Sequence, residues 1–413
     1  MTPKSKEMDP FLERAKRVLR EEGLAGALRK TSLRINAEII RGKLVFLGRG
    51  GPRLIENKKD EPIDPSEINR IMVVSIRGIG DAILATPAMQ MIKSNFQNAE
   101  ITLFASGSAH KILAGAPVID REILIPSGSL EFTHPGFYKA LYEAKDFGPQ
   151  IIFIFYPTLF RPLSEMAPRL MADKIFAADH ESVVPVTKTI SVDESPHVAE
   201  INANLARLAG CREDTPLPEI WLKEEEEEAA EKWLSAKDIN SPLVVIHSGG
   251  TPGLRKYKTW PAEKTAKLIS SIQKNGAGVV LLKGPDEKDI VEKISRKLSE
   301  PCIIAGEELS LRETAALVKK ADLLVANDSS WVNVATAVRT RVIALFGPVN
   351  EKSHPFGQKG KVHVITSPAE CAPCHTLGSR LQCDVPHCME DISFETVFDK
   401  VMDVIRSFPG QNK

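Results

Sequence analysis

Residues 71–87, with the sequence IMVVSIRGIGDAILATP, contain the features that decide the fold. The apolar run over residues 71–74 has no helical period and predicts a buried strand of a parallel sheet. Residues 77–80 (Arg-Gly-Ile-Gly) predict a tight turn, and a helix should begin near Asp81. This order places backbone amides, a helix N-terminus and an ionised carboxylate around one crevice, where a polar ligand could bind and lose a proton.

Strand-like runs alternate with helical stretches from residue 71 onward. Strands are predicted over residues 71–76, 100–104, 122–125 and 151–155, and then over 243–247, 278–282, 303–305, 323–326, 342–346 and 362–365. Helices are predicted around residues 83–94, 137–144, 162–171 and 198–209. This alternation indicates mainly parallel sheets covered by helices. Because 413 residues exceed what one core usually supports, we expect an α/β protein of two Rossmann-like domains that face a central cleft.

The patterns divide the chain into four predicted segments. Residues 1–65 form a basic amphipathic helical extension and a linker, residues 66–222 an N-terminal domain, residues 223–370 a C-terminal domain, and residues 371–413 a cysteine-bearing loop with a final helix. Prolines at positions 62 and 65 mark the linker, and a run of five glutamates from Glu224 follows the boundary between the domains.

Charge is balanced over the whole chain, with 54 Lys and Arg against 54 Asp and Glu, which argues against a protein that coats nucleic acid. Residues 1–54 are an exception and carry an excess of positive charge on an amphipathic pattern. This basic head is either a peripheral anchor on the inner membrane or a helical extension packed on the protein. Since no secretion signal or membrane-spanning run is evident, we expect a cytoplasmic location, with peripheral membrane contact if the head is an anchor.

The glycine turn does not complete a known nucleotide fingerprint. A dinucleotide site needs a third glycine where Ile83 stands, and no acidic residue closes the next predicted strand. No Walker lysine follows the turn either, which excludes a P-loop.

Four polar clusters lie at the predicted sheet edge of the second domain. They are residues 247–250 (HSGG), 258–261 (KTWP), 283–287 (KGPDE) and 326–330 (ANDSS). Their glycines and the following helix N-termini would supply amide donors, and Lys258 would supply a positive charge. One such cluster is ordinary loop chemistry, but four at one edge indicate a diphosphate site.

Together these motifs resemble glycosyltransferase family 9, the heptosyltransferases that build the lipopolysaccharide inner core. The matching stretches are IRGIGDAILATPAM (76–89), residues 249–261 ending in KTWP, LLKGPDE (281–287), ADLLVANDSSWVNVATA (321–337), VIALFGPVNE (342–351) and the cysteine segment CAPC…CDVPHCMEDI (371–392). The resemblance covers the chain from about residue 71 to its C-terminus, and the shared order of several motifs makes it specific.

The resemblance implies a GT-B architecture, with the acceptor on the N-terminal domain and a nucleotide sugar on the C-terminal one. It implies an inverting, metal-independent transfer that requires no cofactor, from ADP-heptose to lipopolysaccharide core or a related lipid-linked glycan. The alternatives are another nucleotide sugar, or a member of the family that binds nucleotide or glycan without turnover.

The resemblance also assigns roles to residues of this sequence. Asp81 would be the general base, with an N-cap role as the alternative or an additional one, and Lys258 would neutralise the leaving diphosphate. The implied donor-binding residues are Gly249, Gly250, Lys258, Glu287, Asp328, Ser329, Ser330 and Asn333, with Glu287 as an acceptor for ribose hydroxyls. The implied acceptor-binding residues are Arg77, Gly80 and Arg161, although either arginine could instead form a structural ion pair.

Two positions depart from the family pattern, which has a glycine at the position of Ser330 and a histidine at that of Asn333. Asparagine can donate a hydrogen bond but cannot carry a positive charge, and the neighbouring Trp331 is bulky. These departures are what keep the two alternatives open.

Four cysteines cluster near the C-terminus, at positions 371, 374, 383 and 388. Cys371, Cys374, Cys383 and Cys388 form either a structural zinc site or a reduced thiol cluster that shapes a loop. Either arrangement would stabilise this segment and would take no part in catalysis. Another isolated feature, His197, is predicted to be a helix cap or a surface residue.

Overall fold

The computed structural model of the protein describes residues 62–125, 135–156, 170, 172–179, 188–191, 197–250, 255–350, 355–374, 383 and 387–408. The basic head, Arg161 and most of the helix predicted over residues 162–171 lie outside these ranges. Within them, no helix is both long and apolar enough to cross a lipid bilayer.

The first sheet contains six parallel strands. They are β1 (Arg70–Ser75), β2 (Glu100–Ser106), β3 (Arg121–Ile125), β4 (Ile151–Ile154), β5 (Lys174–Asp179) and β6 (Lys188–Ser191). Their order, β3-β2-β1-β4-β5-β6, is that of a Rossmann sheet. The four strands predicted in this half are confirmed, whereas β5 and β6 were not predicted.

The second sheet repeats this arrangement with the six predicted strands. They are β7 (Leu243–His247), β8 (Gly278–Leu282), β9 (Ile303–Ala305), β10 (Leu323–Asn327), β11 (Arg341–Phe346) and β12 (Val362–Thr366). The order β9-β8-β7-β10-β11-β12 again places the first and fourth strands of the domain side by side. In both sheets the strand order reverses at that pair, which is where α/β sheets bind ligands.

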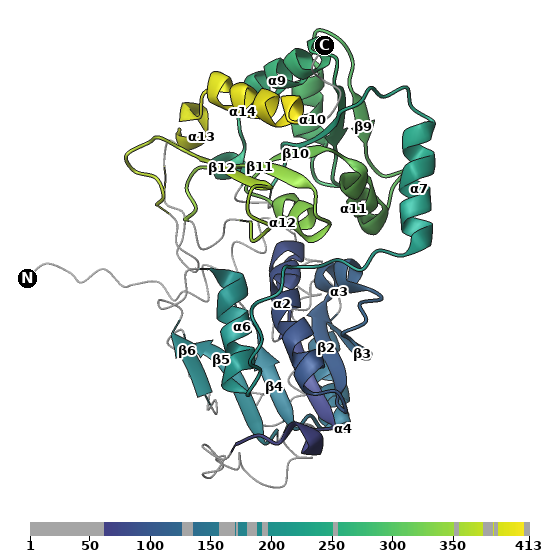
Figure 1. The fold of residues 1–413 in the computed structure, drawn as a ribbon, viewed down its shortest axis with the longest axis vertical. Helices are drawn as coiled ribbons and strands as arrows, with labels where there is room; N and C mark the ends of the chain where they lie inside the picture. The colour runs from purple at the N-terminus through teal and green to yellow at the C-terminus, as the bar shows by residue number, and fades with distance from the viewer. Residues whose placement is uncertain are drawn as a thin grey trace, which may run out of the picture.

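Helices flank both sheets, and the two domains lie one above the other in Figure 1. The first domain has the short 3-10 helix η1 (Pro65–Glu67) and the α-helices α2 (Ile79–Asn95), α3 (Gly107–Leu113), α4 (Pro135–Phe147) and α6 (Val198–Leu208). The second has α7 (Glu224–Ser235), α8 (Arg255–Lys258), α9 (Ala262–Lys274), α10 (Lys288–Ser295), α11 (Leu311–Lys320), α12 (Ser330–Ala337), α13 (Cys388–Asp391) and α14 (Phe394–Arg406).

Strand β1 is buried on both faces, as its continuous apolar run predicts. Ile71 and Val73 join the core that includes α2, while Met72 and Val74 join the core beneath α4. Helices on both faces therefore fix β1 at the centre of its sheet, and the turn that follows it is held at the carboxyl edge.

Helix α2 begins two residues earlier than its sequence predicts. Gly78 is the N-cap and Asp81 is the third helical residue, whose carboxylate accepts a hydrogen bond from the N–H of Gly78 at 3.4 Å. The expected N-cap role of Asp81 is therefore wrong in position: this carboxylate is the acidic partner of a capping box.

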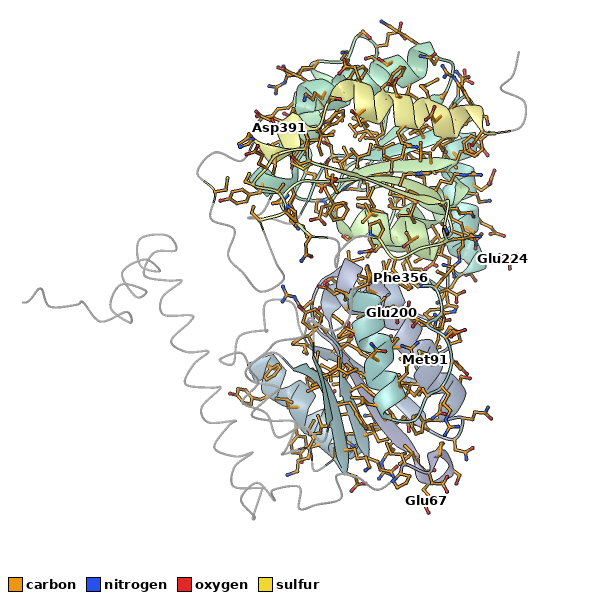
Figure 2. The ribbon with its side chains drawn as sticks, turned by 60° about the vertical axis from the view of Figure 1, so that its left-hand side comes forward. Glu67, Met91, Glu200, Glu224, Phe356 and Asp391 are labelled. Atoms are coloured by element: carbon orange, nitrogen blue, oxygen red, sulfur yellow. The ribbon has the colours of Figure 1, made fainter. Side chains whose placement is uncertain are left out.

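The chain that joins the domains is held from both sides. From α2, the hydroxyl of Thr86 accepts a hydrogen bond from the N–H of Glu219 at 3.0 Å. From the second domain, Arg339 donates to the carbonyl of Pro218 at 2.6 Å. Figure 2 shows Phe356 of the second domain at the junction, above Glu200 of α6. Its ring lies 5.0 Å from that of His197, which caps α6 as one of its predicted alternatives requires.

Arg312 of α11 links three parts of the chain. Its guanidinium binds both carboxylate oxygens of Glu226 in α7, at 2.6 and 2.9 Å. It also donates to the carbonyl of Ile112 in the first domain at 2.8 Å and to that of Trp221 in the connecting chain at 2.6 Å. Burial alone would raise the pKa of Glu226, but the hydrogen bonds from Arg312 and from the backbone N–H of Lys223 outweigh it and lower that pKa.

We expect Arg312→Ala to lower the free energy of unfolding by about 3–5 kcal/mol, because it removes the cation that pairs with the mostly buried Glu226 carboxylate and the donor to two carbonyls. A urea titration followed by circular dichroism measures this. The control is Arg296→Ala, which removes an exposed pair with Glu292 on α10 and should cost less than about 0.5 kcal/mol. Equal losses in the two variants would contradict the linking role.

Candidate active site

The glycine turn places Asp81 at the junction between the domains. Its side chain is 33% exposed, and Arg77 Nε lies 3.8 Å from Asp81 Oδ2. Burial is the largest influence on the pKa of Asp81 and raises it, and the negative charge of Asp328 raises it further. Arg77, the N–H of Gly78 and Lys258 lower this pKa by less. The net pKa therefore lies above the ordinary value of 3.8. Two residues of the second domain thus act electrostatically on this carboxylate, which is suited to accept a proton.

Lys258 and Asp328 form an ion pair on the second domain. Lys258 ends α8, Asp328 follows β10, and the Nζ–Oδ2 distance is 2.6 Å with both side chains mostly buried. The positive charge that the sequence assigns to a diphosphate is therefore balanced by Asp328 in this structure. A bound diphosphate would have to share or replace that partner.

Glu287 is hydrogen-bonded to both loops that follow β7 and β8. One carboxylate oxygen accepts the N–H of Gly250 at 3.2 Å and the other accepts the N–H of Gly284 at 2.8 Å. His247 Nε2 lies 3.0 and 3.1 Å from the two oxygens. With its carboxylate engaged in this way, Glu287 organises the loops, and its predicted contact with a ribose stays a prediction.

His247 is a functional candidate that was not predicted individually from the sequence. Its ring is buried, and its Nδ1 atom lies 3.1 Å from the hydroxyl of Ser329. The ring of Trp331 lies beside it, with centroids 6.1 Å apart. In the sequence this histidine is one member of a polar cluster, and its partners lie 40 and 82 residues away along the chain.

The first turns of α2 and α12 touch across the domain junction. A Cβ at Gly80 would lie 2.9 Å from Asn333 Nδ2 and 3.6 Å from Ser330 Cα, so glycine is what permits this approach. Asn333 is buried, and its Oδ1 has no hydrogen-bond partner among the residues that the structure describes. Gly80, predicted to bind the acceptor, thus lies against the helix predicted to bind the donor.

The structure brings together most of the predicted site residues that it describes. Asp81, Arg77 and Gly80 come from the first domain, and Lys258, Asp328, Ser330 and Asn333 meet them from the second. Arg77 pairs with Asp81, as its ion-pair alternative requires. Arg161 lies outside the described residues.

The four C-terminal cysteines lie within electrostatic reach of one another. The pKa of Cys388 is raised to about 11. Burial is the main cause, and negative charge on Cys374, Cys371 and Cys383 contributes to the same shift. In the described part of the chain, no group of three or more His, Cys, Asp or Glu side chains has an arrangement that could hold a metal ion. The zinc alternative therefore gains no support from these residues.

We expect Gly249→Ala to destabilise the protein by about 1–3 kcal/mol, because the new Cβ would lie 1.6 Å from Glu287 Oε1 and would overpack the loop. The neighbouring Gly250→Ala is the matched control, since its Cβ would meet no atom of the described part of the chain within 4 Å. Thermal and urea unfolding of both variants measure the difference. A loss at position 250 as large as at position 249 would contradict the close packing of Glu287.

Comparison with known proteins supports the same assignment. The sequence model of glycosyltransferase family 9 (heptosyltransferase) matches residues 172–384. Lipopolysaccharide heptosyltransferase 3 of Escherichia coli K12 is 25% identical over 302 residues, which are 69% of this chain and 84% of that protein.

Two solved structures share the fold. A family 9 glycosyltransferase from Veillonella parvula superposes with a TM-score of 0.69 at 19% identity, over 84% of this chain and all of that chain. E. coli ADP-heptose lps heptosyltransferase II superposes with a TM-score of 0.65 at 17% identity, over 82% of this chain and 98% of that chain. The two Rossmann-like domains therefore have the GT-B arrangement. The family match covers more than half of the sequence, and the chain belongs to glycosyltransferase family 9.

Proposed function

We propose that this glycosyltransferase transfers a heptose from ADP-heptose to lipopolysaccharide core or a related lipid-linked glycan. The observation that carries the proposal is the position of Asp81, a carboxylate of raised pKa that meets the Lys258–Asp328 pair at the domain junction. The donor and acceptor are proposed from relatives: one is named a lipopolysaccharide heptosyltransferase and another an ADP-heptose heptosyltransferase.

The proposed transfer is a single inverting displacement. The acceptor hydroxyl oxygen forms a bond to the anomeric carbon while the bond from that carbon to the diphosphate oxygen breaks, and the electron pair leaves with the diphosphate. Asp81 takes the hydroxyl proton, since ionised Asp81 is a stronger base than an ordinary aspartate. Lys258 neutralises charge on the leaving group, which supports a metal-independent mechanism.

A second candidate keeps the fold and changes the ligand. Asn333 stands where the family has a histidine, and within the described ranges its buried amide oxygen meets no hydrogen-bond donor. This favours testing other nucleotide sugars, and also binding without turnover. The proposed peripheral contact with the inner membrane concerns the basic head, which lies outside the described residues.

The first test is transfer from ADP-heptose to a truncated lipopolysaccharide by purified protein. We expect Asp81→Asn to lower the rate about 10²–10⁴-fold, because the amide cannot accept the proton. Asp173→Asn is the control, since this exposed carboxylate precedes β5 at the opposite edge of the sheet. Release of UDP or GDP from another donor, without use of ADP-heptose, would establish the second candidate. Nucleotide binding without transfer, unaltered by Asp81→Asn, would show a binding protein.

The raised pKa of Asp81 predicts an opposite effect on stability. Protonated Asp81 contributes stability that is fully present below the unfolded-state pKa and is lost as pH rises through the higher folded-state pKa. At neutral pH, Asp81→Asn should therefore unfold at higher urea concentration than the unchanged protein. Urea titrations from pH 4 to 8 should show this advantage growing with pH. A difference that is flat or falls with pH would contradict the raised pKa.

A further inference from the structure

We propose that His247 is a positioning residue that fixes Ser329 as a hydrogen-bond acceptor for a hydroxyl of the transferred sugar. The inference rests on the proposed function and adds a determinant of sugar recognition to it. It is carried by three hydrogen-bonded side chains from different elements of the second domain: Glu287 and His247, which are buried, and Ser329, which is partly buried.

The Glu287 end of this chain determines which nitrogen of His247 carries the hydrogen. Both carboxylate oxygens of Glu287 accept a backbone N–H, one from Gly250 and one from Gly284, so this group serves as an acceptor. His247 Nε2 lies 3.0 and 3.1 Å from those oxygens and must donate to them. In the neutral ring the other nitrogen, Nδ1, is then an acceptor.

The Ser329 end follows from that assignment. With Nδ1 as acceptor at 3.1 Å, the hydroxyl of Ser329 donates its single hydrogen to His247. Ser329 is the N-cap of α12, a position where a serine oxygen usually accepts an N–H of the first helical turn. Here the side chain makes no capping hydrogen bond. The hydrogen of Ser329 is therefore committed to His247, whereas its oxygen is not committed to the helix.

The Ser329 oxygen can accept a hydrogen bond but has no hydrogen left to donate, so only a hydrogen-bond donor can bind to it. Phosphate oxygens only accept hydrogen bonds at neutral pH, so they cannot pair with a Ser329 oxygen that has no hydrogen left to donate. A sugar hydroxyl can donate to it. The diphosphate is better matched by Lys258 and by the amides at the start of α12.

The position of Ser329 points to the transferred sugar and not to the ribose. Ser330, the next residue, lies against Gly80, which directly precedes the proposed base Asp81. Because the base must act beside the anomeric carbon, the sugar that bears this carbon lies closest to the start of α12. A hydroxyl of that sugar is therefore the proposed partner of Ser329.

The test compares the binding of ADP and ADP-heptose by isothermal titration calorimetry, without acceptor. We expect Ser329→Ala and His247→Gln each to weaken ADP-heptose about tenfold, the value of one hydrogen bond, and to change ADP less than twofold. Glutamine keeps a donor toward Glu287 and removes Nδ1. The double variant should be no weaker than either single one, because both changes remove the same interaction.

Two further variants separate positioning from folding. His247→Asn keeps a polar atom near the place of Nδ1 and should recover part of the lost ADP-heptose affinity relative to His247→Gln. His363→Gln on β12, the edge strand that lies two strands away from β10, is the matched control and should bind both ligands as the unchanged protein does.

Two results would overturn the inference while leaving the proposed function intact. One is an equal loss of ADP and ADP-heptose affinity in Ser329→Ala and His247→Gln, which would show a purely structural role. The other is unaltered binding of both ligands by His247→Gln. If the unchanged protein binds neither ADP nor ADP-heptose, the proposed donor is wrong and the inference falls with it.

Discussion

The site depends on the direct contact between the first turns of α2 and α12. Each helix N-terminus carries a partial positive charge, so two of them at one place repel each other unless negative charge lies nearby. Asp81 and Asp328 provide that charge. The approach itself requires glycine at position 80, because any Cβ there would meet Asn333 Nδ2 at 2.9 Å. Steric and electrostatic constraints thus act at the same point, and Figure 1 shows α2 and α12 facing each other across the domain junction.

The proposed donor side of the junction is organised by contacts of the protein itself. Glu287 holds the loops after β7 and β8 through backbone N–H groups, and a side chain at position 249 would displace it. Tightly packed loops of this kind cost stability in isolation, and the buried hydrogen bonds between His247 and Glu287 offset that cost. Preorganisation of this kind lets binding energy act on the transition state instead of on ordering the loops.

Much of this fold could be predicted because its buried strands are continuous apolar runs and its turns carry glycine. Strands β5 and β6 escaped prediction because Lys174–Asp179 and Lys188–Ser191 are short and mix charged with apolar residues, as strands toward a sheet edge do. Asp81, Lys258 and Asp328 could be found because each follows a strand at the carboxyl edge. The pairing of His247 with Glu287 and Ser329 could not, because it depends on how β7, α10 and α12 meet in three dimensions.

The contacts that hold the two domains together also bear on the chemistry. Arg312 binds Ile112 and Trp221, and Arg339 binds Pro218, so strong polar links lie along the connecting chain. At the site itself, the domains meet through the small residues Gly80 and Ser330. A hinge motion about the connecting chain would therefore separate Asp81 from Lys258 and Asp328 and expose its carboxylate, now 33% accessible, further to water. Since burial is the largest cause of its raised pKa, the basicity of Asp81 depends on domain closure, and the proposed base is strongest when the two halves of the site are together.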